Sequence, residues 1–292
     1  MKRIIPILVF AGALIFSLSQ CIKKTATPSV SQPIEHKLTT HKEAVDSLML
    51  DSSAPRKPLI IKELRGREAI SVITQANLTK LILNEYPTNG FYGDDRYRIE
   101  FMIDDVKRDS MDARKYYVRG KNRHKKVITP FEGVITLTGV SELIDPNIDT
   151  ADIADLYYVK SYSAKGIFEL KEDTTQLQYS GNFKGNVNID FVTMIDGNVD
   201  MWYFSPETPA HGGGVTYEGT WTSNIKGKDT PKPVIWSNDL FQFANDILKD
   251  FSMGERDVEI NEKYRHLGWA NFWENEEWWN PSAKEEKDKM KM

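Results

Sequence analysis

Hydrophobic and polar residues alternate along the middle of the chain. In one stretch, Ile99 and Phe101 would point to one face of a strand, and Arg98 and Glu100 to the other. The same period of two recurs in three later stretches, residues 131–137, 183–191 and 215–221. This pattern is typical of antiparallel strands that cover a core on one face and meet water on the other. It predicts a mainly β domain over residues 58–252, built as an antiparallel meander.

Glycines punctuate this domain and predict hairpins or bulges. They stand at positions 120, 133, 139, 166, 181, 185, 197 and 219. Asp196-Gly197-Asn198 is the sequence of a hairpin turn, and it predicts one between Phe191 and Trp202.

Two stretches follow a different pattern. A cap sequence, Ser237-Asn238-Asp239, precedes apolar residues at helical spacing, and Gly254 follows them. These apolar residues are Leu240, Ala244, Ile247, Leu248 and Phe251. Cap, stripe and terminating glycine predict a helix here. Residues 69–83 are consistent with either a helix or two strands broken near Asn77, and periodicity does not decide between them.

The first residues have the pattern of an export signal. Lys2 and Arg3 give a charged start, and the apolar run from Ile4 to Phe16 is shorter than the roughly 20 residues needed to span a bilayer. Residues 1–20 are therefore predicted to be a signal peptide. Its removal lowers the 38 basic residues to 36 against 42 acidic residues, so the mature chain is the more acidic form.

The only cysteine, Cys21, lies where the signal ends. With Leu18 and Ser19 before it, this segment resembles the lipid-attachment site of bacterial lipoproteins, with Gln20 where a small residue is usual. The resemblance implies acylation of Cys21, stable anchoring through several acyl chains, and a place in the cell envelope at the outer membrane. The alternative is ordinary signal cleavage, with Ser17 and Ser19 as the small residues, which would release a soluble exported protein.

Composition narrows the class of protein further. A single cysteine excludes an internal disulfide and any multi-cysteine zinc site, and the near-neutral charge argues against a nucleic-acid binder. Residues 21–57 are rich in Pro, Ser and Thr, and we interpret them as a disordered tether.

Glycines and aromatic residues recur at short spacings along the β domain. They occur in Phe131-x-Gly133, Gly181-x-Phe183-x-Gly185 and Gly219-Thr220-Trp221. Over residues 91–236 the chain resembles the calycin-like or lipocalin-like domains of bacterial envelope proteins. The resemblance implies a small barrel, closed or nearly closed, that either holds an apolar ligand or is filled by side chains.

The C-terminal segment, residues 253–292, combines aromatic residues with a charged tail. Trp269, Trp273, Trp278 and Trp279 are its candidate contacts with a ligand or partner, since exposed tryptophans stack on sugars and anchor interfaces. The alternative is that Trp269, Phe272 and Trp273, at helical spacing, form a short helix that packs on the barrel.

No catalytic set is found in the sequence. His211-Gly212-Gly213-Gly214 resembles the oxyanion loop of esterases, but no serine lies between two glycines in the way that a nucleophile elbow requires. The acidic run 145–155 lacks the glycine and glutamate of a calcium loop, and the basic run 119–126 is typical of a charged hairpin. We expect neither a metal nor a cofactor.

The sequence therefore predicts a lipid-anchored, non-enzymatic binding or scaffold module of the cell envelope. Its partners would be the membrane and a small apolar ligand, a glycan or an envelope protein. Two alternatives remain: an inhibitory or structural protein with a cationic partner, and a carbohydrate-active enzyme whose two carboxylates the sequence does not identify.

Overall fold

The computed structural model describes residues 56–147, 158–201, 205–228, 230–240, 246–249, 259–270 and 278–280. The predicted signal peptide, Cys21 and most of the predicted tether lie outside these residues. Trp273 also lies outside them.

The described part of the chain is mainly β, as the alternation predicts. One antiparallel sheet holds ten strands. They are β1 (Ile60–Glu63), β2 (Thr88–Tyr92), β3 (Tyr97–Arg108), β4 (Lys115–His124), β5 (Val127–Ile144), β6 (Tyr158–Glu172), β7 (Gly181–Met194), β8 (Val199–Met201), β9 (Val215–Ser223) and β10 (Lys232–Ser237). A second sheet pairs β11 (Leu248–Lys249) with β12 (Glu259–Ile260).

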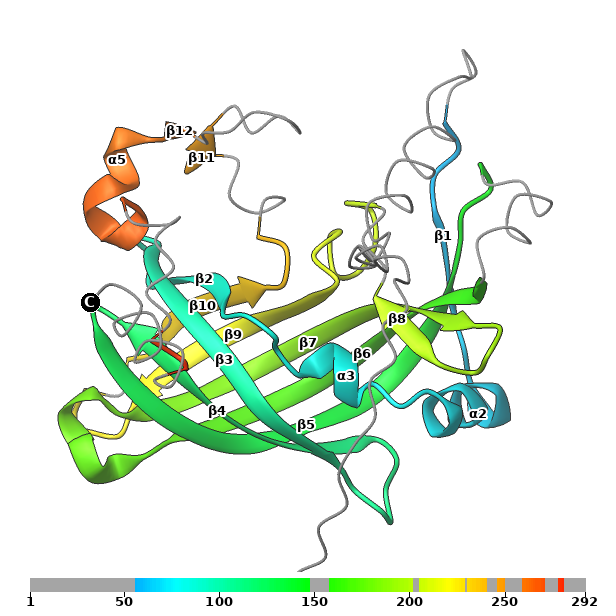
Figure 1. Ribbon diagram of the computed structural model, residues 1–292, viewed down its shortest axis with the longest axis horizontal. Coiled ribbons are helices and arrows are strands. Elements are labelled where there is room, and N and C mark those ends of the chain that lie inside the picture. Colours follow the sequence, from blue (N-terminus) through cyan, green and yellow to red (C-terminus); the bar gives the residue numbers. More distant parts are fainter. Residues whose placement is uncertain are drawn as a thin grey trace, which may run out of the picture. The chain divides into compact units, whose positions relative to one another are not determined.

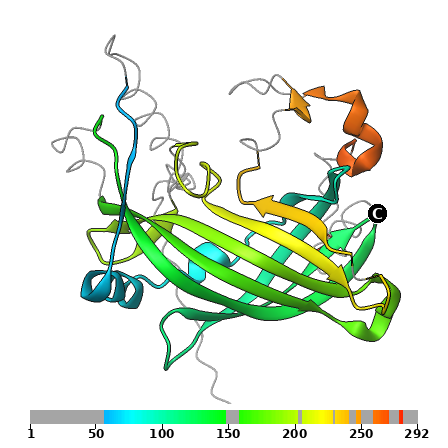
Figure 2. The same ribbon diagram turned by 180° about the vertical axis from the view of Figure 1, so that it is seen from behind.

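The large sheet closes on itself by hydrogen bonding. Its strands follow the order β5-β4-β3-β2-β10-β9-β7-β6, and β6 pairs again with β5. β8 pairs with β7 alone and lies outside this ring. Within the ring each strand pairs with the strands before and after it in sequence, and the first strand, β2, pairs with the last, β10. The fold is therefore an up-and-down barrel. The strands curve around a common interior, and β1 runs beside the end of β5 (Figures 1 and 2).

Aromatic side chains fill the middle of this barrel. Trp236 of β10 lies between two stacked rings, with Phe101 at 4.0 Å on one side and Tyr217 at 4.6 Å on the other. Phe168 and Phe183 meet the Trp236 ring edge-on. All five side chains are buried, so the central layer of the barrel is a packed core.

Several glycines lie inside strands, where the sequence analysis expected hairpins or bulges. A Cβ atom added at Gly120, Gly133, Gly185 or Gly219 would come within 2.1 Å of a carbonyl oxygen on the neighbouring strand. These positions therefore allow close backbone approach in a strongly coiled sheet. The turn predicted at Asp196-Gly197-Asn198 is confirmed between β7 and β8, where Gly197 has a φ of 84°.

Two short helices cover one end of the barrel. They are α2 (Gly66–Gln75) and α3 (Thr79–Ile82), so the helical alternative for residues 69–83 is correct, with a break at Asn77. Asn77 Oδ1 accepts hydrogen bonds from the backbone and hydroxyl of Thr79, which begins α3. Apolar residues of both helices join the core of the barrel.

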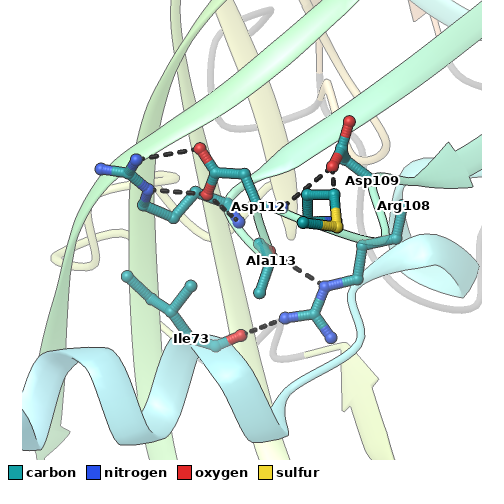
Figure 3. A network of polar contacts seen from close by, with 7 residues as sticks. Ile73, Arg108, Asp109, Asp112 and Ala113 are labelled. Carbon is teal, nitrogen blue, oxygen red and sulfur yellow. Dashed lines mark hydrogen bonds and ion pairs between the residues drawn. The ribbon is translucent and has the colours of Figure 1, made fainter.

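Arg108, at the end of β3, fixes α2 in this position. Its guanidinium donates to the carbonyl oxygen of Ile73, and its Nε donates to the carbonyl oxygen of Ala113 at 2.9 Å (Figure 3). The guanidinium also donates to the carbonyl oxygen of Thr74 at 3.2 Å. The carbonyls at the end of a helix carry partial negative charge and lack partners within the helix. A cation at this point therefore stabilises the helix and its attachment to the barrel.

The C-terminal elements pack against the outer face of the barrel. Phe91, Leu240, Ile247, Ile260, Tyr264 and Trp269 form a second apolar cluster there. It includes residues of β12, of α5 (Glu262–Tyr264) and of the following π-helical turn (Arg265–Trp269).

The predicted helix over residues 240–251 is wrong where the structure describes it. Leu248 and Lys249 form β11, which pairs with β12 across the predicted domain boundary at 252. The apolar residues of this stretch pack into the second cluster on the outer face of the barrel, where Leu240 and Ile247 are both buried. Residues 241–245, 250 and 251 lie outside the described residues.

Candidate functional site

A cleft lies on the outer face of the barrel, near the turn from β2 to β3. Strand register places Glu218 of β9 beside Ile235 of β10, and Ile235 beside Phe91 of β2. Their neighbours Tyr217 and Trp236 point into the barrel core. Because side chains alternate across a strand, these three residues form one row on the opposite face.

This outer cleft has a volume of about 420 Å³. It is lined by Phe91, Gly93, Asp94, Arg96, Glu218, Gly219, Pro233, Val234 and Ile235. The volume falls in the range of small-molecule sites, and the combination of an apolar floor with a few polar groups at its border is typical of them.

The turn between β2 and β3 borders the cleft and is tied to the C-terminal segment. Arg96 has a φ of 58°, and its Nη1 lies 2.7 Å from both carboxylate oxygens of Asp246. Its guanidinium also lies over the ring of Phe91, and its carbonyl accepts a hydrogen bond from Nε1 of Trp269 at 3.0 Å. The positive charge of Arg96 is thus paired with Asp246.

The two acidic residues of the cleft are exposed. Asp94 belongs to the turn, and Glu218 lies on β9 across the apolar floor. Within the described part of the chain, no ion pair involves either of them, and the only basic residue lining the cleft is Arg96. The charged side chains that line the cleft are thus two exposed carboxylates and one arginine that is already paired, beside an apolar floor.

A second group of polar residues occupies the barrel end opposite α2. Glu172 is buried there, and its carboxylate accepts from Asn122 at 2.6 Å, from the backbone of Gly181 at 2.7 Å and from Trp221 at 2.8 Å. Burial raises the pKa of Glu172, although these hydrogen bonds oppose the rise. The carboxylate thus joins β4, β6, β7 and β9.

His124 lies beside this group, between two tyrosine rings. Its ring centroid is 4.4 Å from that of Tyr92 and 5.2 Å from that of Tyr97. Burial, with a smaller effect of Lys125, lowers the pKa of His124 to about 4, so its imidazole is neutral at neutral pH. Together with Trp221, these rings pack over the end of the barrel core.

The basic run found in the sequence is dispersed by the fold. His124 points inward, and the hairpin turns at Lys125 and Lys126, which both have positive φ. Arg123 Nε lies 2.6 Å from Glu100 and Lys121 Nζ lies 3.8 Å from Asp104. Two cations of this run are thus paired with carboxylates of β3.

The C-terminal tryptophans have different environments. Trp269 is fully buried against Phe91, with ring centroids 5.4 Å apart, so it presents no exposed ring to a ligand. Trp278 is half-buried under the guanidinium of Arg123, and its neighbour Trp279 accepts a hydrogen bond from Lys121 through its carbonyl.

The packing of Trp278 affects two residues that the alternating pattern predicts on the solvent-facing side of β3. Arg98 and Glu100 are both buried, and the ion pair between them measures 3.1 Å. Trp278 Nε1 lies 3.4 Å from Glu100.

The loop His211-Gly212-Gly213-Gly214 has a structural explanation. A Cβ atom at Gly213 would lie 2.1 Å from Oγ of Ser237, which donates to the Gly213 carbonyl at 3.0 Å. Thr216 donates to the Ala210 carbonyl at 2.9 Å. Hydroxyl groups on β9 and β10 thus hold this loop against the barrel, and the glycines allow the close approach.

Comparisons with protein-family models, with curated proteins and with solved structures found no match to this chain. In the part of the chain that the structure describes, no cluster of His, Asp and Glu could hold a metal ion. No helix in that part is long and apolar enough to cross a membrane.

Sequence reasoning did not find the outer cleft. Its floor comes from Phe91 and Ile235, which lie far apart in the chain, and its acidic residues stand singly in their segments. The available signal was an apolar residue on the polar face of each of two strands.

Proposed function

We propose that this protein is an exported, lipid-anchored and non-enzymatic module of the cell envelope that binds a small ligand in the outer cleft. The observation that carries the binding role is the cleft itself, 420 Å³ in volume with an apolar floor. The aromatic stack around Trp236 occupies the barrel centre, which supports a ligand site outside the barrel.

The barrel is well suited to such a role because it holds the cleft rigidly. Ile235 and Phe91 lie on paired strands whose inward neighbours belong to the packed core. The bond from the Gly93 backbone to the Pro233 carbonyl, at 2.8 Å, joins the turn to β10. A preformed apolar surface of this kind binds without a large cost in ordering.

The binding role is tested with n-octanol as a neutral apolar probe. Two-dimensional NMR titration should move the amide signals of Gly93, Val234 and Ile235. Pro233→Trp should block these shifts, because Pro233 is exposed at the cleft and a Trp side chain would fill it. Ile167→Trp is the matched control on an exposed position of β6.

Both variants should retain cooperative thermal unfolding. Shifts spread over the whole protein, or unchanged binding in Pro233→Trp, would contradict the proposed role of the cleft.

The anchoring role rests on the signal-like start of the chain and on Cys21. Labelled fatty acid should enter the wild-type protein made in bacteria and not the Cys21→Ser variant. Equal labelling of the two proteins would refute lipid attachment at Cys21, and it would leave the binding role untouched.

A further inference from the structure

We propose that the ligand of the outer cleft is an amphipathic cation, a small molecule with an apolar body and one ammonium group. This inference rests on the proposed binding function and specifies its ligand class. It follows from the distribution of charge around the apolar floor.

The side chains of two acidic residues, Asp94 and Glu218, line the cleft. Glu218 lies next to Ile235 on one side, and Asp94 lies in the turn on the other side. Both are exposed, and neither takes part in an ion pair within the described part of the chain. Their charges are therefore free to act on a ligand that lies over Ile235.

Arg96, the cation that lines the cleft among the described residues, does not offset these two carboxylates. Arg96 is held by both oxygens of Asp246 at 2.7 Å, so its charge is already balanced. A carboxylate ligand would meet two like charges without a free basic partner, whereas an ammonium group would meet two opposite ones.

Charge alone does not define the ligand, because the cleft also has an apolar floor. Pro233 and Ile235 offer carbon surface that a small hydrated cation would leave uncovered. A ligand that covers this surface and also reaches a carboxylate gains from both, since apolar burial contributes to affinity in proportion to area. The volume of 420 Å³ fits a single small molecule.

The test compares three probes with the same chain length, namely n-octylammonium, n-octanol and octanoate. Isothermal titration at neutral pH should give the order octylammonium, octanol, octanoate from tightest to weakest. Exposed ion pairs are weak, so each carboxylate should contribute roughly two- to five-fold in affinity. The preference for octylammonium should fall as salt is raised, because exposed charges are screened.

Asp94→Asn and Glu218→Gln keep the shape of the cleft and remove its charges. The double variant should bind octylammonium and octanol equally, and octanol should bind it as it binds the wild type. Glu132→Gln, an exposed glutamate on β5, is the matched control and should leave all affinities unchanged.

The outcomes separate this inference from the binding function. Equal affinity of octanol and octylammonium for the wild type would overturn the cationic ligand and leave the cleft as an apolar site. A preference that survives in the double variant would overturn it as well. Failure of every probe to bind at the cleft would overturn the binding function and this inference with it.

Discussion

Asp190 and His124 are expected to give the protein opposite dependences of stability on pH. Asp190 is fully buried on β7, opposite Ser163 of β6 and under the loop that holds Ala210. Burial raises the pKa of Asp190 from 3.8 to about 6, although contacts with Ser163, Thr208 and the Ala210 N–H oppose the rise. His124 is the counterpart, since burial lowers its pKa from 6.5 to about 4.

The signs follow from which state binds the proton. Between pH 3.8 and 6 the folded state holds the proton of Asp190 and the unfolded state has lost it. The contribution of Asp190 is therefore present at low pH and is lost as pH rises through 6. Between pH 4 and 6.5 the unfolded state holds the proton of His124, so its contribution is lost as pH falls through this range.

The two contributions are similar in size. Each pKa differs by about 2 units between the folded and unfolded states, which corresponds to roughly 3 kcal/mol. In the wild type they largely cancel between pH 4 and 6.5. Removing one of them should reveal the other.

The assay is urea unfolding of the wild type, Asp190→Asn and His124→Gln at several pH values over this range. Relative to the wild type, Asp190→Asn should gain free energy of unfolding as pH rises, and His124→Gln should lose it. Subtracting the wild-type curve removes the common contribution of the surface carboxylates. Difference curves with the same sign, or with no slope, would refute the assignment of these two groups.

Two further predictions concern residues that hold the barrel together. Arg108→Met should lower the free energy of unfolding by about 2 kcal/mol, because it leaves the carbonyls at the end of α2 without their charged donor. The melting temperature should fall accordingly, and an unchanged melting temperature would contradict the role of Arg108. Gly213→Ala should lower the melting temperature more than Gly197→Ala does. At Gly213 the new Cβ would lie 2.1 Å from Ser237 Oγ. At Gly197 the new Cβ would meet open space, and only the backbone φ of 84° would be strained. Equal melting temperatures for these two variants would count against the packing of the glycine loop.

Much of the sheet could be predicted because its strands face a single core. Ile99 and Phe101 point inward as their period of two indicates, and the turn at Gly197 follows from its local sequence. These features depend on neighbouring residues alone, so the sequence is sufficient to find them.

Features of the outer face could not be predicted in the same way. The alternation treats Arg98 and Glu100 as residues that face water, since it carries no information about a distant segment that covers them. Helical spacing at Ile247 and Leu248 likewise reflects contact with the barrel and pairing with β12, which no local pattern contains. The outer cleft depends on strand register between β2, β9 and β10, and it was missed for that reason.

The pairing of β2 with β10 has a consequence for how the chain folds. Tyr92 lies opposite Val234, so the bonds that complete the ring join the first and last of its strands. Contacts between residues so far apart in sequence form late and slow the overall reaction. Until they form, both strands present unpaired backbone groups that another strand can recognise. The step that completes the barrel is thus the one at which a newly made chain is most open to pairing with a second copy of itself.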